Sequence, residues 1–285
     1  MKESKKHIRV TERRNPRSRG LHRKSTREIL RIISRDDAQV ARAVAREIPV
    51  MTQAVDAIVR ALRRGGRLIY VGAGTSGRLA TLDAAEIPPT FGVSSKMVQA
   101  VIAGGQRALT EAVEGAEDSA AAGARDLRAK RVTSRDVVVG ITASGTTPYV
   151  LGALAYARRR GAMTIALTAN RGTPVGRATR ITIAPQTGPE VVTGSTRMKA
   201  GTAQKMVLNM LSTTAMVRLG RVYDNWMIGV ALTNRKLRER GVRILCEATG
   251  ASVAEAERAL RQVGDRLPVA LERLKRRAQG VGGRV

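Results

Sequence analysis

Cysteine and histidine are scarce in this sequence, and their scarcity limits its redox and metal chemistry. Among 285 residues there are one cysteine, Cys246, and two histidines, His7 and His22. A single cysteine cannot form an internal disulfide, and these three side chains do not make up the ligand set of a metal site. We therefore expect a protein of a reducing compartment that holds no metal ion, with Cys246 packed as a small apolar side chain on a helix.

Aromatic residues and long apolar runs are also lacking. Phe, Trp and Tyr make up 2% of the sequence although 43% of its residues are hydrophobic, so the core must consist mainly of aliphatic side chains. Nowhere do about 18 apolar residues follow one another, and the basic N-terminus is not followed by an apolar segment. We therefore expect a cytoplasmic protein that neither spans a membrane nor carries a cleavable signal.

Acidic residues are few, and the charge is strongly unbalanced. Asp and Glu number 23 against 51 Lys and Arg, which gives a formal net charge of +28. Such a charge can attract nucleic acid by releasing counterions from its phosphates. The basic residues, however, are spread along the whole chain, and aromatic platforms for stacking on single strands are almost absent. We expect at most non-specific binding of polyanions, whereas the charge favours capture of a small, doubly anionic substrate.

Two loops each follow an apolar run and combine glycine with hydroxyl residues. A strand, a glycine turn and a helix in this order place backbone N–H groups and hydroxyls where a phosphate can bind. Two such loops favour an anionic sugar site. The residues expected to contact the ligand are Gly74, Thr75 and Ser76 in the first loop and Ser144, Gly145 and Thr147 in the second.

The first loop also fits the G-x-G-x-x-G pattern of dinucleotide-binding folds, from Gly72 to Gly77. That pattern requires an acidic residue about 20 positions later, at the end of the second strand, to hold the ribose. Here the second apolar run, residues 97–103, ends in Gly104 and Gly105 without a carboxylate. The sequence therefore favours a sugar phosphate over a dinucleotide.

Apolar runs and helical patterns alternate through the middle of the chain. Residues 137–139 and 164–167 are almost continuously apolar, as strands covered on both faces require. The alternation predicts an α/β fold with a doubly wound parallel sheet, in which ligands bind at the carboxyl ends of the strands. We expect strands at residues 67–72, 97–103, 136–142, 162–168 and 180–184, and helices at residues 76–86, 106–130, 147–160 and 201–219.

The composition divides the chain into three parts. Residues 1–24 form a basic N-terminal arm without apolar periodicity, a pattern typical of a mobile segment. Residues 25–225 are expected to form the sugar-phosphate-binding domain, whose N-terminal helices begin at the capping pattern Ser25 to Glu28. Residues 226–285 are expected to form a small C-terminal helical subdomain.

A third polar loop, residues 188–201, opens the helix expected at 201–219. Its hydroxyls and basic side chains offer a further contact for an anion, in particular through Ser195 and Lys199. Ser195 can equally serve only as a helix cap, and the sequence leaves both interpretations open. We count Ser195 and Lys199 among the candidate substrate-binding residues.

Taken in order, these segments resemble the N-acetylmuramic acid 6-phosphate etherases, bacterial enzymes of cell-wall recycling with the SIS (sugar isomerase) fold. The resemblance covers most of the chain and includes several long runs. Because one of them lies in the basic arm, it argues against a wholly disordered arm. The runs are residues 11–16, 66–79, 88–90, 114–118, 147–150 and 193–211.

The resemblance implies a homodimeric carbon–oxygen lyase that needs neither a metal nor an organic cofactor. Such an enzyme removes the D-lactyl ether from C3 of N-acetylmuramic acid 6-phosphate and yields N-acetylglucosamine 6-phosphate and D-lactate. A base takes the C2 proton, and an acid protonates the departing lactate oxygen before water adds at C3. By position in the matching motifs, Glu117 would be the base at C2 and Glu86 the acid and base at C3. One glutamate must then hold a proton near neutral pH, through burial or a neighbouring carboxylate.

Thr146 is a departure from the family pattern. The etherases usually show Ser-Gly-Arg-Thr-Pro-Tyr where this chain has residues 144–149, so Thr146 stands in place of an arginine. A hydroxyl cannot make the two parallel hydrogen bonds by which the guanidinium group of an arginine binds a phosphate. The loss leaves room for a second hypothesis, a non-catalytic sugar-phosphate-sensing regulatory protein like the glucokinase regulatory proteins. Glu86 and Glu117 favour the enzyme, and an aldose-ketose isomerase would lack a histidine base because both histidines lie in the arm.

Overall fold

The computed structural model describes residues 9–281, and the chain divides into two compact units. The first unit takes in the chain up to Ala85 together with Lys96–Ala215. The second takes in Glu86–Ser95 and the chain from Met216 onward. His7 and the first eight residues of the basic arm lie outside the described residues.

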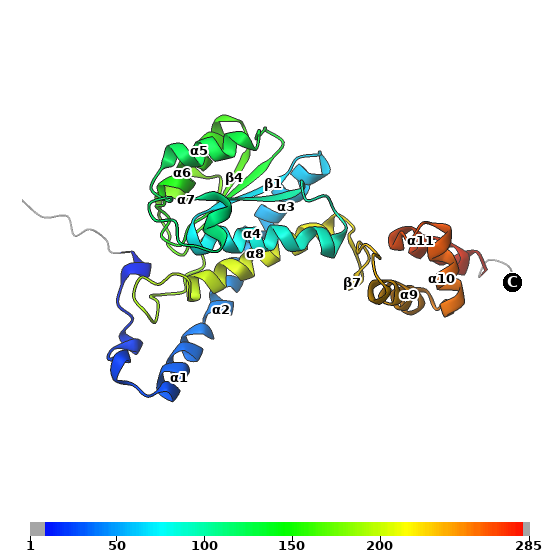
Figure 1. Ribbon diagram of the computed structural model, residues 1–285, viewed down its shortest axis with the longest axis horizontal. Helices are drawn as coiled ribbons and strands as arrows, with labels where there is room; N and C mark the ends of the chain where they lie inside the picture. Colours follow the sequence, from blue (N-terminus) through cyan, green and yellow to red (C-terminus); the bar gives the residue numbers. More distant parts are fainter. Residues whose placement is uncertain (1–8, 282–285) are drawn as a thin grey trace, which may run out of the picture. The chain divides into compact units, whose positions relative to one another are not determined.

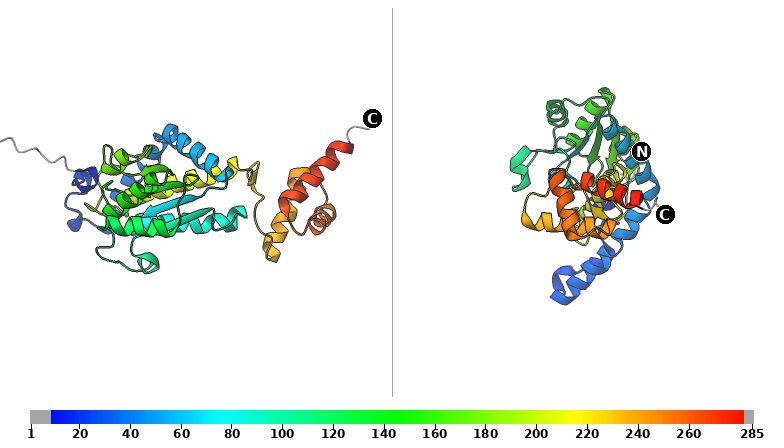
Figure 2. Two further views of the ribbon diagram at one scale, coloured as in Figure 1. Left: turned by 90° about the horizontal axis from the view of Figure 1, so that it is seen from above. Right: turned by 90° about the vertical axis from the view of Figure 1, so that its right-hand side faces the viewer.

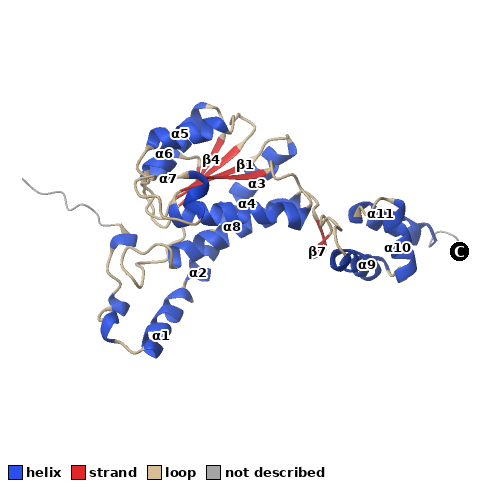
Figure 3. Ribbon diagram, in the orientation of Figure 1, coloured by secondary structure: helices blue, strands red, loops and turns tan. Residues whose placement is uncertain are grey.

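The first unit is built on a five-stranded parallel sheet (Figures 1 and 3). The strands lie in the order β2-β1-β3-β4-β5, and each neighbouring pair is parallel. This confirms the predicted α/β fold, and each strand falls within the segment expected for it. The strands are β1 (Leu68–Gly72), β2 (Val98–Ile102), β3 (Val137–Ile141), β4 (Met163–Leu167) and β5 (Ile181–Ile183).

Helices cover both faces of this sheet (Figures 1 and 2). On one face, Ile69 and Val138 pack with apolar residues of α5 (Ala120–Ala129), α6 (Pro148–Arg159) and α7 (Pro174–Ala178). On the other face, the Tyr70 hydroxyl donates to Asp83 Oδ2 of α4 (Gly74–Phe91) at 2.9 Å. Ser212 of α8 (Lys199–Arg218) donates to Asp83 Oδ1 at 3.1 Å, so one buried carboxylate joins β1, α4 and α8.

The helices α5 and α6 approach each other closely because each has a glycine at the contact. A Cβ on Gly123 would lie 1.9 Å from the carbonyl oxygen of Tyr149, and one on Gly152 would lie 1.9 Å from that of Ala120. Neither position can therefore carry a side chain without moving the backbone. This contact fixes the start of α6 against the start of α5.

The segment predicted as one helix over residues 106–130 is interrupted, so this prediction was wrong in part. A short 3-10 helix, η4 (Gly105–Leu109), is followed by turns, and α5 begins only at Ala120. Gly115, within these turns, has a left-handed φ of 70° that an α-helix does not contain, and the Ser119 hydroxyl accepts the N–H of Ala122 as the cap of α5. Glu117 consequently lies in a loop.

Three short turns and three helices precede the sheet. The described part of the basic arm forms η1 (Val10–Glu12), η2 (Pro16–Ser18) and η3 (Leu21–Arg23). The predicted capping pattern starts α1, since the Glu28 carboxylate accepts the N–H of Ser25 at 2.8 Å. In Figures 1 and 2, α1 extends away from the sheet. The helices are α1 (Thr26–Asp37), α2 (Val40–Ala45) and α3 (Ile48–Arg63).

The second unit is mainly helical and has its own core. A hairpin of β6 (Val222–Tyr223) and β7 (Trp226–Met227) precedes α9 (Arg235–Thr249), α10 (Val253–Gln262) and α11 (Leu267–Val281). Leu245 and Leu260 are fully buried in this core, and Cys246 packs beside it, half-buried on α9. Among the helices described between residues 9 and 281, none is long and apolar enough to cross a membrane.

Candidate active site

The first hydroxyl loop lies where β1 ends and α4 begins. Because α4 starts at Gly74, the residues Gly74, Thr75 and Ser76 form its first turn, where free N–H groups and the helix dipole attract anions. The turn is tight, since a Cβ on Gly72 would lie 2.7 Å from the next turn's backbone nitrogen. Ser76 Oγ donates to Gln204 Oε1 at 3.0 Å, and this buried hydrogen bond holds the turn against α8.

The second hydroxyl loop lies between β3 and α6, and its hydroxyls are close together. Thr142 Oγ1 lies 2.8 Å from Thr147 Oγ1 and 3.1 Å from Ser144 Oγ. Gly145 has a φ of 77° and passes so close to Thr173 that a Cβ would lie 2.4 Å from the Cβ of that residue. Thr147 is the N-cap of α6, so this hydroxyl cluster (Thr142, Ser144 and Thr147) lies at a second helix N-terminus.

A cavity of about 280 Å³ lies between these two loops, and we call it the central cavity. No Lys or Arg is among the described residues that line it, so a phosphate there would be held by hydroxyls, backbone N–H groups and two helix N-termini. Six candidate residues line it: Gly74, Thr75, Ser76, Glu117, Ser144 and Thr147. Gly145 shapes the second loop without lining the cavity.

Glu117 lies on the wall of the central cavity in the loop before α5. Its carbonyl accepts the N–H of Tyr149 at 3.0 Å, which ties this loop to the first turn of α6. Its side chain is exposed to solvent. A neighbouring hollow of about 240 Å³ shares Gly74, Thr75 and Glu117 with the central cavity. The carboxylate therefore stands where two hollows meet, within reach of a ligand held by the hydroxyl loops.

Lys199 and Ser195 are not among the residues that line the central cavity. Lys199 Nζ lies 2.6 Å from Asp36 Oδ2, and both side chains are almost fully buried. Burial alone would raise the pKa of Asp36, but the hydrogen bond and charge of Lys199 hold that pKa below its usual value. Ser195 is half-buried, and its neighbours Gly194 and Thr196 line the cavity in its place.

A buried carboxylate fixes the third polar loop. Glu190 accepts the N–H of Lys199 at 3.0 Å and that of Ala200 at 2.9 Å, at the start of α8. Burial raises the pKa of Glu190 in spite of these two hydrogen bonds. The carboxylate thus acts as the anionic cap of α8 and positions the loop that carries Gly194 and Thr196.

Glu86, the second carboxylate indicated by the sequence, belongs to the other unit of the chain. It is exposed on α4 in the second unit, and it is not among the residues that line the central cavity. Its carbonyl accepts the hydroxyl of Thr90 at 2.7 Å. The cavity of one chain therefore contains Glu117 but not the second carboxylate that the sequence indicated.

Thr146 has an arginine beside it, although this arginine is not part of the loop. Arg9 of the basic arm donates from Nη1 to Thr146 Oγ1 at 2.8 Å. Both residues line a second cavity of about 300 Å³, which also contains Arg13 and Arg171. Arg171 is paired with Glu47 at 3.1 Å. A guanidinium thus reaches the second hydroxyl loop from outside it.

Sequence reasoning missed three polar side chains of the central cavity: Glu12, Thr142 and Thr196. Thr142 could have been found, because it follows directly on the third apolar run and precedes Ser144 by two positions. Glu12 and Thr196 belong to segments whose place beside the sheet no local pattern encodes. Glu12 is a second carboxylate in the same cavity as Glu117.

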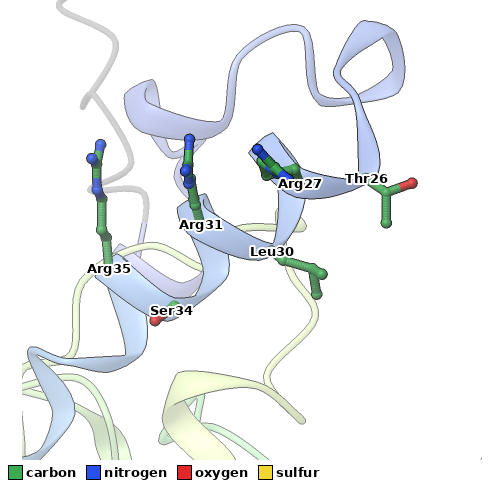
Figure 4. A pocket seen from close by; sticks show the side chains of 6 residues that line it. All are labelled: Thr26, Arg27, Leu30, Arg31, Ser34 and Arg35. Carbon is green, nitrogen blue, oxygen red and sulfur yellow. The ribbon is translucent and has the colours of Figure 1, made fainter.

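A hollow of about 690 Å³ lies on the exposed face of α1 (Figure 4). It is lined by Thr26, Arg27, Leu30, Arg31, Ser34 and Arg35. In Figure 4, Arg31 and Arg35 point to one side of the helix, while Leu30 and Thr26 project to another. None of the candidate residues lies in it and it contains no carboxylate, so it is not a candidate for the catalytic cavity.

The parallel sheet and the hydroxyl loops at its carboxyl edge define an SIS-fold domain. The model described as "SIS domain" matches residues 105–214, and that of the "Glucokinase regulatory protein N-terminal SIS domain" matches residues 50–158. A phosphoheptose isomerase from Francisella tularensis superposes with a TM-score of 0.55 at 20% identity, over 68% of this chain and 100% of that chain. The predicted SIS fold is confirmed.

Curated relatives specify the family within this class. The N-acetylmuramic acid 6-phosphate etherase of Aeromonas hydrophila is 53% identical over 92% of this chain and 88% of its own length. That of Geobacillus thermodenitrificans is 52% identical over 92% of this chain and 89% of its own length. The chain belongs to the N-acetylmuramic acid 6-phosphate etherase family, as its motifs predicted.

Proposed function

We infer that this chain is an N-acetylmuramic acid 6-phosphate etherase, a carbon–oxygen lyase that releases D-lactate and leaves N-acetylglucosamine 6-phosphate. The observation that carries this inference is identity above 50% to etherases over about nine tenths of the chain. The central cavity supports it, because two hydroxyl loops and Glu117 surround a space suited to a small phosphorylated sugar. We place the enzyme in the cytoplasm and expect it to need no cofactor.

The hydroxyl cluster of the second loop is the proposed binding site of the substrate's phosphate. Thr142, Ser144 and Thr147 now hydrogen-bond to one another, so their hydroxyls can turn to donate to a bound anion. The N-terminus of α6 adds a partial positive charge at the same place. When the phosphate of the substrate is bound here, the rest of the sugar extends toward Glu117.

The proposed chemistry is an elimination followed by addition of water. Glu117 takes the C2 proton, the C2–H electron pair forms a double bond to C3, and the C3–O bond breaks. The lactate oxygen leaves with that bond's electrons and takes a proton from Glu86. Water then adds its oxygen to C3 as Glu86 removes its proton, and a proton returns to C2. The acid is needed because an alkoxide is a poor leaving group.

We propose that Glu86 reaches the substrate across a homodimer interface. Glu86 is absent from the central cavity of its own chain, yet the reaction requires both carboxylates at one C2–C3 bond. Leu82, four residues earlier on the same face of α4, is 46% exposed. Leu30 of α1 is 61% exposed, and Ile32 on that helix is only half-buried. Association with a second copy would cover these apolar side chains, and the partner subunit's Glu86 could then complete the site.

The proposed function is tested with the purified chain and two glutamine variants. With N-acetylmuramic acid 6-phosphate, the parent protein should release D-lactate and, in D₂O, exchange the C2 hydrogen of the sugar. Glu117→Gln should lose both reactions by about a hundredfold or more, because the base acts first. Glu86→Gln should lose lactate release but retain C2 exchange, since the proton is removed before the ether bond breaks.

Asp118→Asn serves as the matched control, because Asp118 is an exposed carboxylate next to Glu117 that does not line the central cavity. It should behave as the parent protein does, as should the parent after dialysis against a chelator. Binding of the sugar phosphate without lactate release would favour the regulatory protein of the same fold. Release that survives both glutamine substitutions would refute the assignment of the two carboxylates.

A further inference from the structure

The basic arm brings a second carboxylate into the central cavity. Glu12 lies at the end of η1 and lines the cavity together with Glu117 and the hydroxyl loops. Its neighbour Thr11 is buried at 2% exposure, whereas Glu12 itself is exposed. The arm thus forms part of the wall of this cavity.

Val10 and Thr11 of the arm are hydrogen-bonded to the sheet edge that carries the second hydroxyl loop. Asn170 Oδ1 accepts the N–H of Val10 at 2.9 Å, and Asn170 Nδ2 lies 3.4 Å from Thr11 Oγ1. The same Nδ2 donates to the carbonyl of Ala143 at 2.8 Å. One buried amide therefore fixes the residues before Glu12 to the loop that carries Ser144.

The continuation of the arm is held by a second buried amide. Asn15, 5% exposed, donates from Nδ2 to Asp36 Oδ2 at 2.7 Å and to the carbonyl of Pro189 at 3.1 Å. The same Asp36 oxygen is bonded to Lys199 Nζ. Glu12 thus lies between two anchored points, and its position is set by the fold of the first unit.

The Glu12 carboxylate lies beside the third polar loop. Gly194 of that loop has a left-handed φ of 79°, and a Cβ on it would lie 3.6 Å from Glu12 Oε2, an ordinary van der Waals distance. Thr11 Oγ1 lies 3.4 Å from Glu12 Oε1 and is the one hydrogen-bond partner described for this carboxylate. With respect to residues 9–281, most of the hydrogen-bonding capacity of the carboxylate is therefore open to a ligand.

We propose that Glu12 binds the substrate directly, as a hydrogen-bond acceptor for hydroxyl groups of the sugar chain. A carboxylate repels phosphate, so it cannot contribute to the phosphate-binding site. It accepts strong hydrogen bonds from neutral hydroxyl groups. Because it lines the same cavity as the hydroxyl cluster, it favours a ligand that has a phosphate at one end and a polyol beyond it. This inference rests on the proposed function for the identity of the sugar and adds a substrate-binding residue to its site.

The test compares a sugar phosphate with phosphate alone. The dissociation constants of N-acetylglucosamine 6-phosphate and of inorganic phosphate are measured by calorimetry for the parent, Glu12→Gln and Glu12→Ala, alongside the KM and kcat of lactate release. We expect the dissociation constant of the sugar phosphate and the KM to rise about tenfold, as loss of a charge-assisted hydrogen bond predicts. The constant for inorganic phosphate should stay the same or fall, because a negative charge is removed.

Two further variants separate binding from structure. Asp56→Asn removes an exposed carboxylate on α3 that lines neither cavity, and it should change none of these constants. Asn15→Ala loosens the arm and should raise the KM in the same direction as the Glu12 variants, with a lower melting temperature.

Unchanged sugar-phosphate binding in both Glu12 variants would overturn the inference. Equal loss of affinity for sugar phosphate and for inorganic phosphate would also overturn it, because that result indicates a distorted loop. If the parent binds the sugar phosphate but releases no lactate, the proposed function fails while the binding comparison still decides the role of Glu12.

Discussion

At the scale of single residues, the hydroxyl at position 146 and the guanidinium of Arg9 have to be considered together. The family pattern places an arginine in the second hydroxyl loop, and this chain has Thr146 there. The structure places Arg9 Nη1 2.8 Å from the Thr146 hydroxyl, so a cation from the arm stands beside the loop. This contact offers a physical reason why the substitution at residue 146 need not abolish phosphate binding.

Arg9→Ala should therefore weaken substrate binding. We expect the KM for N-acetylmuramic acid 6-phosphate to rise about three- to tenfold at low salt with little change in kcat, because the cation acts on binding and not on the ether bond. Thr146→Arg introduced into the Arg9→Ala protein should restore the KM. Arg14→Ala, at an exposed position of the same arm that lines neither cavity, is the control. An unchanged KM for Arg9→Ala would show that the arm does not replace the loop arginine.

The sequence predicted those site residues that lie close to the end of a strand, and it missed those that come from elsewhere in the chain. Thr75, Ser76, Ser144 and Thr147 follow directly on apolar runs, so strand periodicity alone placed them at one edge of the sheet. Glu12 enters the cavity through hydrogen bonds between the arm and residues far along the chain. Such contacts leave no periodic signal, and the resemblance in residues 11–16 gave a family motif without a position in space.

At the scale of secondary-structure elements, the strands were predicted well and one helix poorly, for the same physical reason. Strands covered on both faces must be almost wholly apolar, and the five runs stand out from their surroundings. The interrupted helix at residues 106–130 has no such contrast. Its alanines favour a helix, whereas the left-handed backbone at Gly115 belongs to turns and the cap at Ser119 starts α5 only afterwards.

The starts of β1 and β3 are joined by an ion pair between a buried carboxylate and a partly exposed arginine. Asp136 is 2% exposed and accepts hydrogen bonds from Arg67 Nη2 at 2.8 Å and from the N–H of Thr133 at 2.8 Å. Burial alone would raise the pKa of Asp136, but these partners hold that pKa below its ordinary value. Because the folded-state pKa is lowered, the stabilisation is complete above the unfolded pKa of about 4 and is lost as the pH falls through the folded pKa.

Asp136→Asn should therefore lower the free energy of unfolding by about 2 kcal/mol at pH 7, a figure reduced from that for a fully buried pair because Arg67 is partly exposed. The difference from the parent should shrink as the pH falls below the unfolded pKa of about 4, because the carboxylate of the unfolded chain then gains a proton more readily than that of the folded chain. Urea unfolding at pH 7 and pH 3 measures both values. An effect of equal size at the two pH values would mean that packing and not charge accounts for the loss, and Asp56→Asn should show no effect at either.

At the scale of the whole molecule, the net charge complements the central cavity. The described lining of that cavity contains carboxylates and hydroxyls but no cation, so the nearby positive charge comes from the helix N-termini and from Arg9 beside the second loop. The net charge of +28 is spread over the rest of the chain and produces a long-range potential that draws anions toward the protein. The charge thus supports capture of the substrate, while the hydroxyl loops fix its orientation.

The proposed mechanism requires a dimer, because the two glutamates of each active site come from different chains. If a site uses Glu117 of one chain and the partner subunit's Glu86, then Glu117→Gln and Glu86→Gln homodimers are each inactive, but a heterodimer of the two contains one intact site. Co-expression with two different affinity tags isolates this heterodimer, and we expect about half of the parent's rate of lactate release from it, as one of two symmetric sites is whole. Were both glutamates needed from the same chain, each site of the heterodimer would lack one of them. A heterodimer that light scattering shows to be intact but that releases no lactate would therefore exclude the shared site.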